Sequence, residues 1–378
     1  MPTVQIIDKT VISNARTRIA GLDTLRGLAI MLVLLYHCTP NSNPNLGLSS
    51  LVFKVANIGW AGVDLFFALS GYLVCSMLLD IKQRGRPVSV FFWNRLLRIM
   101  PIYYLTLALV LIAYPAISGA EMPRLHETYP YWLYINNNIL DLNASFYAAD
   151  INLGHFWSLA LEMQFYVLIP LLVMYCSRKS LVTTLAITWL GVITWRFYAV
   201  YTGTEPDITF GFSQFRCDGL LLGALVAARR DPLKSQPAFL CLALLSACYL
   251  IWMIWLSQGS AIFKHGTDFY LHRALLPTTI GIVSAYALTM ALKKKEYTGV
   301  FRFSILAFLA KYSYGIYIYH FLFNDYLEDS LVPWLSAFLL SQNQVAFGFF
   351  SLQLCLSTSV AWISFHFFEK HFLALKKH

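Results

Sequence analysis

The chain has 378 residues, of which 58% are hydrophobic, 16% are aromatic and only 12% are charged. The charged fraction is about half of that in an average soluble domain, which excludes a disordered chain, a disulfide-rich secreted module and an ordinary water-soluble enzyme. The formal net charge is +9, but the cations lie between apolar runs and therefore indicate membrane topology rather than nucleic-acid binding. A polytopic membrane protein is the first interpretation.

Ten apolar runs follow one another along the chain, and most are long enough to cross a hydrocarbon core of about 30 Å. Backbone polar groups in lipid must be satisfied within their own segment, so we expect each run to form a helix. The runs lie at about 22–38, 57–79, 96–114, 155–176, 180–198, 212–228, 238–257, 273–292, 304–323 and 344–367. They predict an all-α bundle of about ten transmembrane helices, with the number open by one because Arg216 and Asp218 interrupt the sixth run.

The distribution of Lys and Arg predicts the orientation of this bundle. Most cations outside the apolar runs lie in the two tails and in alternate loops, and the positive-inside rule places these segments in the cytoplasm. We therefore expect a cytoplasmic N-terminal tail at 1–21, a membrane domain at 22–370 and a cytoplasmic C-terminal tail at 371–378, in the inner (plasma) membrane. Residues 1–21 are polar and lack a convincing cleavage site, so we expect no cleavable signal peptide.

The longest predicted outer connection, 115–154, is rich in Tyr, Asn and acidic residues. Its aromatic side chains are compatible with a cover over a site, with contacts to sugars or with an interfacial belt. The seven cysteines of the chain lie mostly inside apolar runs and form no Cys-x-x-Cys pair. We interpret them as small buried hydrophobic residues rather than as metal ligands or disulfides.

The first apolar run carries Arg26 near its predicted cytoplasmic end and His37 near its outer end. Eleven residues separate them, which corresponds to about 16 Å of helix rise and returns to nearly the same helix face. Ionisable groups within membrane spans are unfavourable and by default indicate function. The alternative is an arginine that snorkels to one interface and a histidine that lies in the other.

The second run contains Asp64, a carboxyl group that helix packing does not explain. Ser70 and Gly71 in the same run are small residues that allow close helix packing or local bending. In the sixth run, Arg216 and Asp218 are expected to neutralise each other or charges on other spans.

Arg95 and Arg98 are i,i+3 neighbours at the start of the third run, on the predicted cytoplasmic side and level with Arg26. Three arginines at one depth are typical of a phosphate receptor. The positive-inside rule and the binding of anionic lipid explain them equally well.

Within the fourth run, His155 and Glu162 are seven residues apart and share a helix face. Glu162 lies about 10 Å below the predicted outer boundary, where a carboxylate needs a proton, a partner or water. His37 reaches a comparable depth, and a neighbouring carboxylate would fix the tautomer of a general base. The alternative is a structural Arg or Tyr as the partner of Glu162. In the ninth run, Tyr317 and His320 belong to a polar aromatic face that suits an interfacial belt or an acceptor pocket.

Four blocks of this sequence resemble those of acyltransferase family 3, a family of integral-membrane acyltransferases. The first block is the spacing from Arg26 to His37, the second is 62–72, the third is 95–101 and the fourth is 155–166. The blocks stand in the order that the family shows and at matching topological depth. The resemblance covers the chain from about 20 to 370.

The resemblance implies a membrane enzyme that transfers an acyl group, often acetyl, from a cytoplasmic acyl-CoA to a hydroxyl of an extracytoplasmic carbohydrate such as O-antigen or exopolysaccharide. Acetyl-CoA or another acyl-CoA, the carbohydrate and membrane lipids are thus the expected partners, without metal or nucleic acid. The implied catalytic residues are His37, Glu162 and His155. The implied donor-binding residues are Arg26, Arg95, Arg98, Ser70, Gly71 and Tyr72. The implied acceptor-binding residues are Asp64, Trp157, Ser158, Tyr166, Tyr317 and His320.

The same geometry suggests a mechanism. With the donor phosphates at the three arginines, an extended pantetheine arm of about 15–20 Å brings the thioester near His37. In direct transfer His37 removes the proton of the acceptor hydroxyl, Glu162 or another carboxylate orients the imidazole, and Ser158 or Tyr317 donates to the oxyanion. A covalent acyl-histidine is the variant mechanism.

A transporter or flippase of an envelope glycan or lipid intermediate is the alternative class, since it shares long helices and buried ionisable groups. Such proteins often show two-fold hydropathy symmetry and broken spans at matching places, and neither is visible here. A structural or lipid-binding protein does not explain the four blocks. Some members of the family carry an appended hydrolase-like domain, which we do not expect in this chain.

Overall fold

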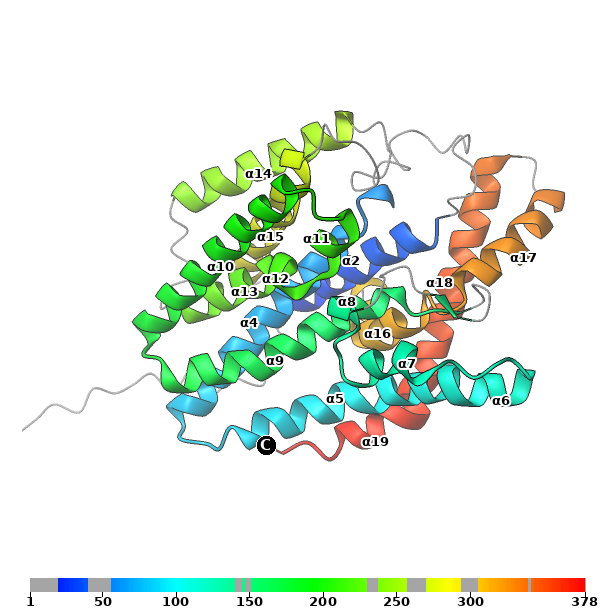
Figure 1. Cartoon of the computed structure of the whole chain (residues 1–378), viewed down its shortest axis with the longest axis horizontal. Coiled ribbons are helices and arrows are strands. Elements are labelled where there is room, and N and C mark those ends of the chain that lie inside the picture. Colours follow the sequence, from blue (N-terminus) through cyan, green and yellow to red (C-terminus); the bar gives the residue numbers. More distant parts are fainter. Residues whose placement is uncertain are drawn as a thin grey trace, which may run out of the picture.

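The computed structural model describes residues 20–39, 56–139, 145–146, 151–229, 237–256, 270–293, 305–338 and 341–377. Over these ranges the chain is almost entirely helical, and one short antiparallel pair joins β1 (Ser145–Phe146) to β2 (Ile151–Asn152). The helices form an elongated bundle (Figure 1). Six helices of the described part are long and apolar enough to cross a membrane. The prediction of an all-α, polytopic membrane protein is therefore confirmed.

Each of the ten predicted apolar runs overlaps a helix. These helices are α2 (Ala20–His37), α4 (Ala61–Gln83), α5 (Ser89–Ala108), α9 (Trp157–Tyr175), α10 (Arg178–Tyr201), α13 (Asp218–Ala228), α14 (Pro237–Leu256), α15 (Tyr270–Lys293), α16 (Ile305–Tyr319) and α18 (Gln342–Ser364). Two of them, α13 and α16, have only 11 and 15 residues, fewer than the roughly 20 that a membrane span needs. The number of ten spans and the cytoplasmic position of both termini stay predictions.

Two helices are extended by π-helical turns. The helix α5 continues through η2 (Leu109–Ala113) into α6 (Tyr114–Ser118), and α18 continues through η5 (Phe365–Glu369) into α19 (Lys370–Leu373). Proline inside α5 and α9, at positions 101 and 170, is tolerated because neighbouring helices and local adjustments satisfy the freed backbone groups in membrane proteins.

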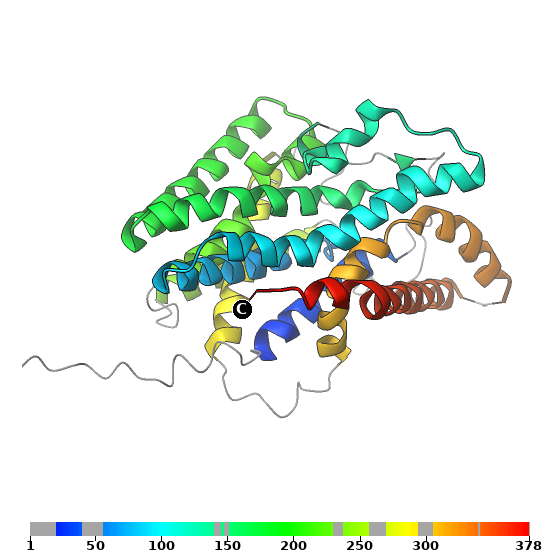
Figure 2. The same ribbon diagram turned by 90° about the horizontal axis from the view of Figure 1, so that it is seen from below.

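Several shorter helices were not predicted from the sequence. They are α7 (Leu125–Trp132), α8 (Asn136–Ile139), α11 (Pro206–Gly211) and α17 (Asn324–Phe338). Two more short helices, η3 (Gly154–Phe156) and α12 (Ser213–Arg216), fall at the starts of the predicted runs 155–176 and 212–228. The helix α17 packs beside α18 at one edge of the bundle (Figure 2).

Aromatic residues of the predicted outer connection fasten it to α5. The Tyr103 hydroxyl donates to the carbonyl of Tyr131 at 2.8 Å, and the Tyr104 hydroxyl donates to the carbonyl of Trp132 at 3.0 Å. The ring of Tyr134 stacks on Tyr103 with a centroid distance of 4.1 Å. These contacts pack the connection against α5, and the three roles that the sequence leaves open for it stay predictions.

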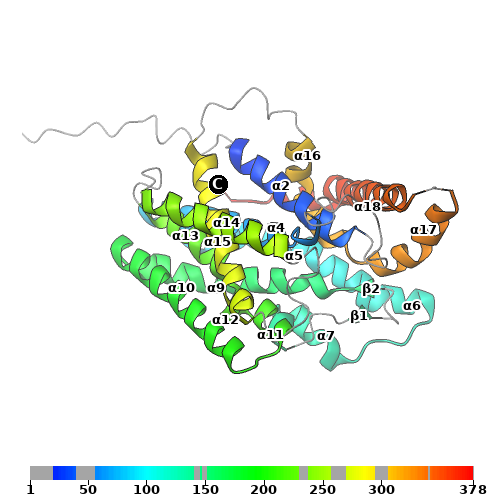
Figure 3. The same ribbon diagram turned by 90° about the horizontal axis from the view of Figure 1, so that it is seen from above.

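Glycines allow the central helices to approach closely, as expected for membrane helix packing. A Cβ atom added at Gly223 of α13 would lie 2.0 Å from the Ala68 carbonyl oxygen of α4, and one at Gly71 would lie 2.1 Å from the Leu220 oxygen of α13. The helix α2 meets α16 in the same way through Gly27 (Figure 3). The helix pairs α4–α13 and α2–α16 are therefore held at short separations.

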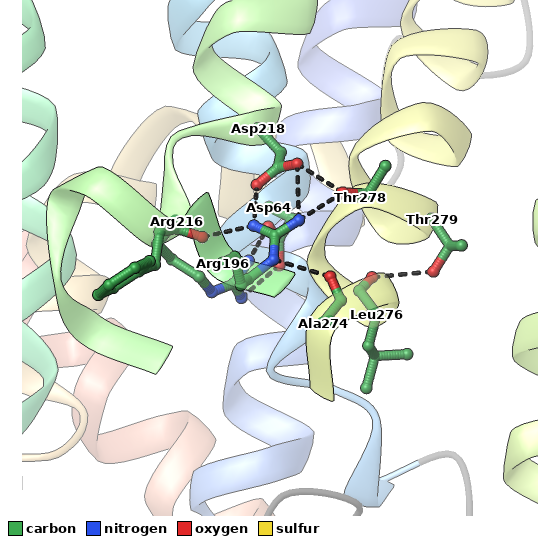
Figure 4. A network of polar contacts seen from close by, with 9 residues as sticks. Asp64, Arg196, Arg216, Asp218, Ala274, Leu276, Thr278 and Thr279 are labelled. Carbon is green, nitrogen blue, oxygen red and sulfur yellow. Dashed lines mark hydrogen bonds and ion pairs between the residues drawn. The ribbon is translucent and has the colours of Figure 1, made fainter. Parts of the chain in front are cut away.

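Two buried ion pairs join helices that are distant in the sequence (Figure 4). The Arg216 guanidinium donates to both carboxylate oxygens of Asp64, at 2.5 and 2.8 Å. The Arg196 guanidinium donates to both oxygens of Asp218, at 2.6 and 3.2 Å, and Thr278 contacts both members of that pair. All four charged side chains are fully buried. Arg216 and Asp218 thus neutralise charges on other helices and not each other.

Candidate functional site

A cavity of about 420 Å³ lies between α2, α4, α5, α9 and α16. Its volume is within the range of small-molecule binding sites in proteins. Along α4 the lining extends from Val63 to Met77, a separation of fourteen residues that corresponds to about 21 Å of helix rise. The cavity therefore runs along the helices rather than across them, and its two ends have different chemistry.

One end of the cavity is basic. Arg26 of α2, Arg95 and Arg98 of α5, and Lys376 line it together. Arg26 has Asp23 as a partner at 3.3 Å. Arg95, Arg98 and Lys376 have no hydrogen bond or ion pair to any residue that the structure describes, and the buried Nε of Arg95 has no partner there. Unpaired cations gathered in a membrane bundle suit an anionic ligand.

Arg95 is held in place by aromatic rings. Its guanidinium lies 5.2 Å from the ring centroid of Tyr166 and 6.0 Å from that of Phe91. Stacking of this kind orients an arginine while leaving its N–H groups free for a planar anion. The structure thus brings together the three arginines that the sequence placed at one depth.

Lys376 also lines this end, although the sequence places it only in the basic C-terminal tail. Burial, and then the positive charges of Arg98 and Arg95, lower the pKa of Lys376 to about 8. The lysine follows the last apolar run by nine residues, and nothing in the local pattern indicates that the segment folds back onto α5.

In the middle of the cavity, Glu162 accepts hydrogen bonds from the hydroxyls of Ser70 and Tyr166, both on its Oε1 atom. Ser70 and Tyr166 also contact each other at 2.7 Å. Its other oxygen, Oε2, has no hydrogen-bond partner in the described ranges of the chain. The expected contact between Glu162 and His37 does not occur; the alternative of a tyrosine partner is the arrangement found.

The other end of the cavity is formed by hydroxyl groups. Ser158 Oγ and the Tyr317 hydroxyl lie 2.5 Å apart, and each is close to the carbonyl oxygen of His155, at 3.1 and 3.0 Å. Three contacts are present but only two hydroxyl hydrogens are available. One hydroxyl can therefore turn toward a ligand at little loss.

Three histidines gather beyond this end. His37 Nδ1 lies 3.0 Å from His320 Nε2, and His320 Nδ1 lies 2.7 Å from the carbonyl oxygen of Tyr317. His155 Nε2 lies 3.1 Å from the Ile318 carbonyl oxygen, and its buried Nδ1 has no partner among the described residues. The centroid of the His320 ring is 5.0 Å from that of His37 and 5.2 Å from that of His155.

These contacts assign the hydrogens. A carbonyl oxygen only accepts, so His320 donates from Nδ1 and presents a lone pair at Nε2. His37 then donates from Nδ1 to His320, and its own Nε2 carries a lone pair. The arrangement fixes the tautomer of His37 by a histidine, where the sequence analysis expected a carboxylate.

The cavity does not reach the ring of His37, which is a correction to the expected open path from the arginines. The lining ends at Ser158 and Tyr317. The Tyr317 ring lies 5.5 Å from the ring of His320 and 5.6 Å from that of His155, measured between centroids. One layer of side chains therefore separates the cavity from the histidines.

Besides the three histidines, four other predicted site residues lie outside the cavity lining. Asp64 is occupied by Arg216, and Gly71 is at the contact between α4 and α13. Trp157 packs against Phe210, with centroids 5.1 Å apart. Tyr72 packs against the hydrophobic core and does not line the cavity.

Comparison with known proteins gives the class of this chain. Residues 19–366 match the model of the family described as acyltransferase domain. The chain belongs to this acyltransferase family, which confirms the resemblance seen in the sequence.

Individual relatives are distant but extensive. A Staphylococcus aureus (strain COL) protein with the provisional name of O-acetyltransferase is 25% identical over 94% of this chain and 57% of its own length. The peptidoglycan O-acetyltransferase OatA of Listeria monocytogenes is 24% identical over 81% of this chain and 49% of its own length. This chain thus spans about half the length of the curated relatives that it matches. No solved structure matches it.

Proposed function

We propose that this protein is a membrane O-acetyltransferase that moves an acetyl group from acetyl-CoA to a hydroxyl of a cell-envelope carbohydrate. Family membership supports acyl transfer, and the names of the relatives support acetyl as the group and a cell-envelope glycan as the acceptor. The observation that carries the proposal is a cavity with two kinds of end. At one end lie Arg95 and Arg98, which have no ion pair to a described residue, and at the other lie hydroxyls backed by histidines.

The donor enters at the basic end. Its phosphates bind Arg26, Arg95 and Arg98, because guanidinium groups present several donors to phosphate oxygens. The pantetheine arm, about 15–20 Å when extended, matches the cavity of about 21 Å along α4. The thioester then lies beside Ser158 and Tyr317. With ten spans and both termini in the cytoplasm, as the distribution of cations predicts, this basic end faces the cytoplasm of the inner (plasma) membrane.

The free oxygen of Glu162 lies along this path. A carboxylate oxygen accepts hydrogen bonds from amide N–H groups, and the pantetheine arm carries two amides. Glu162 therefore holds the arm of the donor, with Ser70 and Tyr166 fixing the carboxylate. Holding the arm replaces the role that the sequence suggested for Glu162, which was to orient His37. We assign the orientation of His37 to His320.

Transfer takes place at the boundary between cavity and histidines. For transfer, the Tyr317 side chain must move aside, because it separates the cavity from the histidines. His37 Nε2 then removes the proton of the acceptor hydroxyl while the hydroxyl oxygen attacks the thioester carbonyl. The hydroxyl of Tyr317 or Ser158 donates to the oxyanion that forms. The intermediate collapses with formation of the ester and cleavage of the C–S bond, and the CoA thiolate receives the proton from His37. An acyl-histidine at the same nitrogen is the covalent variant.

The test uses membranes that contain the protein and acetyl-CoA labelled in the acetyl group. We expect base-labile label in the envelope carbohydrate, and none with membranes of the His37→Ala variant. Equal labelling with membranes that lack the protein would refute the proposal. The same assay separates the two classes, because a transporter of the acceptor does not itself transfer the label.

A further inference from the structure

The segment 374–377, which follows α19, is bound to the beginning of α5 (Figure 1). Asn94 donates from Nδ2 to the Lys377 carbonyl oxygen at 2.8 Å, and its Oδ1 accepts from the Lys377 backbone N–H at 2.9 Å. The indole N–H of Trp93 donates to the Leu375 carbonyl oxygen at 3.1 Å. One amide side chain thus satisfies both backbone groups of Lys377, which fixes this residue and the one before it.

This attachment directs two adjacent lysines to different surroundings. The Lys377 ammonium lies 5.4 Å from the ring centroid of Trp93, outside the cavity. The Lys376 side chain lines the cavity with Arg95 and Arg98 and has no anionic partner among the described residues. Burial of a third cation beside two others is unfavourable unless an anion joins them. Consistent with this, burial and the two arginines lower the pKa of Lys376 to about 8.

We propose that Lys376 is an additional donor-binding residue that contacts a phosphate of acyl-CoA, and that Asn94 is the positioning residue that holds it at the cavity. This inference rests on the proposed function and adds two residues to it. A lysine ammonium acts as a compact point charge toward phosphate. It complements the guanidinium groups of the arginines, which bind two oxygens at once.

The experiment measures binding of acetyl-CoA to the full chain in nanodiscs of neutral lipid. A charge-assisted hydrogen bond corresponds to about 10- to 100-fold in affinity, so Lys376→Met is expected to weaken binding by that factor. Lys376→Arg keeps the charge and is expected to stay within a few-fold of the wild type. Lys377→Met is the matched control and is expected to have no effect, because Lys377 lies over Trp93.

Asn94→Ala tests the positioning role. We expect it to weaken acetyl-CoA binding in the wild-type background and to have no further effect in the Lys376→Met background. An equal effect in both backgrounds would show that Asn94 acts independently of the lysine, and would overturn its part of the proposal.

The pH dependence gives a second readout. Below pH 8 the ammonium is charged and binds phosphate; above it the free protein must take up a proton on binding, so affinity falls by up to tenfold per pH unit. The other charged and titratable groups that face this end are Arg26, Arg95, Arg98, Glu162, Tyr166, Tyr314 and Glu369. The contributions of these groups persist in the Lys376→Arg variant. Only the part of the fall in affinity at high pH that is absent from this variant is therefore due to the lysine.

The outcomes distinguish a failure of the role of Lys376 from a failure of the proposed function. If the wild type binds acetyl-CoA, Arg95→Ala weakens binding and Lys376→Met does not, the donor site stands and the role of Lys376 is wrong. If Lys376→Met and Lys377→Met weaken binding equally, a general charge effect replaces the specific contact. If the loss appears only in nanodiscs with anionic lipid, the phosphate bound by Lys376 belongs to a lipid and the inference is wrong. If the wild type does not bind acetyl-CoA at all, the proposed function itself fails.

Discussion

His37 Nδ1 lies 3.0 Å from His320 Nε2 and joins two residues that are 283 positions apart in the sequence. Because His320 donates from its other nitrogen to the Tyr317 carbonyl, the pair has a defined order of hydrogens. The lone pair of His37 Nε2 is then available to a hydroxyl group. His37 Nε2 is thus held one layer of side chains beyond the end of the cavity. The thioester is proposed to lie at that end, inside the cavity.

Replacement of His37 tests this nitrogen. A general base contributes about 100- to 10,000-fold to rate, so His37→Ala is expected to lower turnover by that range while the dissociation constant of acetyl-CoA stays unchanged. Binding is spared because His37 does not line the cavity. His272→Gln is the matched control, since His272 contacts Tyr249 in a separate cluster. Turnover and binding are measured on the same purified samples; normal turnover of His37→Ala would contradict the base role.

Two amide replacements of His320 test the hydrogen-bond order. The Gln side chain places an acceptor near the position of Nε2 and can still accept from His37, whereas the shorter Asn cannot. We expect His320→Gln to keep turnover within about tenfold of the wild type and His320→Asn to lose about 100-fold. Equal losses, measured as kcat at saturating donor, would show that His320 acts only through packing.

The basic end is tested with the nucleotide half of the donor. Arg95→Ala and Arg98→Ala are each expected to weaken binding of 3′,5′-ADP by about tenfold or more, since each removes charge-assisted hydrogen bonds to phosphate. Arg84→Ala is the control, because Arg84 pairs with Asp80 at 2.7 Å on the surface. Calorimetric titration measures the affinities. Wild-type affinity in both cavity variants would show that these arginines do not bind the donor and serve only membrane topology.

Glu162 is expected to distinguish the two halves of the donor. Glu162→Gln removes the acceptor oxygen that faces the cavity, so acetyl-CoA is expected to bind about tenfold more weakly. Binding of 3′,5′-ADP is expected to be unchanged, because that ligand lacks the pantetheine arm. The two ligands are compared by the same titration. An equal loss for both would indicate that Glu162 supports the basic end and does not hold the arm.

The ion pair between Arg216 and Asp64 is expected to stabilise the fold. Both side chains are fully buried, and removal of one partner from such a pair costs about 3–5 kcal/mol. Arg216→Met is therefore expected to unfold at a lower temperature, and the addition of Asp64→Asn is expected to restore part of the loss. Arg84→Ala breaks an exposed pair and should change stability by at most about 1 kcal/mol. Thermal unfolding in detergent checks all three; a smaller loss in Arg216→Met than in Arg84→Ala would contradict the assignment.

Much of the site was visible from depth along the predicted helices. Arg26, Arg95 and Arg98 were expected at one level, and they line one end of the same cavity. Depth alone did not identify partners, however. Glu162 and His37 were expected to meet because they lie at similar depths, but Glu162 bonds Ser70 and Tyr166 while His37 bonds His320.

The composition and spacing of the chain determined by themselves that it is a helical membrane protein, where its ten apolar helices lie and which of them carry charges. These properties follow from local hydrophobicity and the helical repeat, which need no knowledge of neighbours. Only the tertiary structure decided that Asp64 pairs with Arg216, that the cavity ends at Tyr317, and that Lys376 joins the arginines. These outcomes depend on how helices far apart in sequence rotate and pack against each other, and hydrogen bonds form only when that packing brings atoms within about 3 Å.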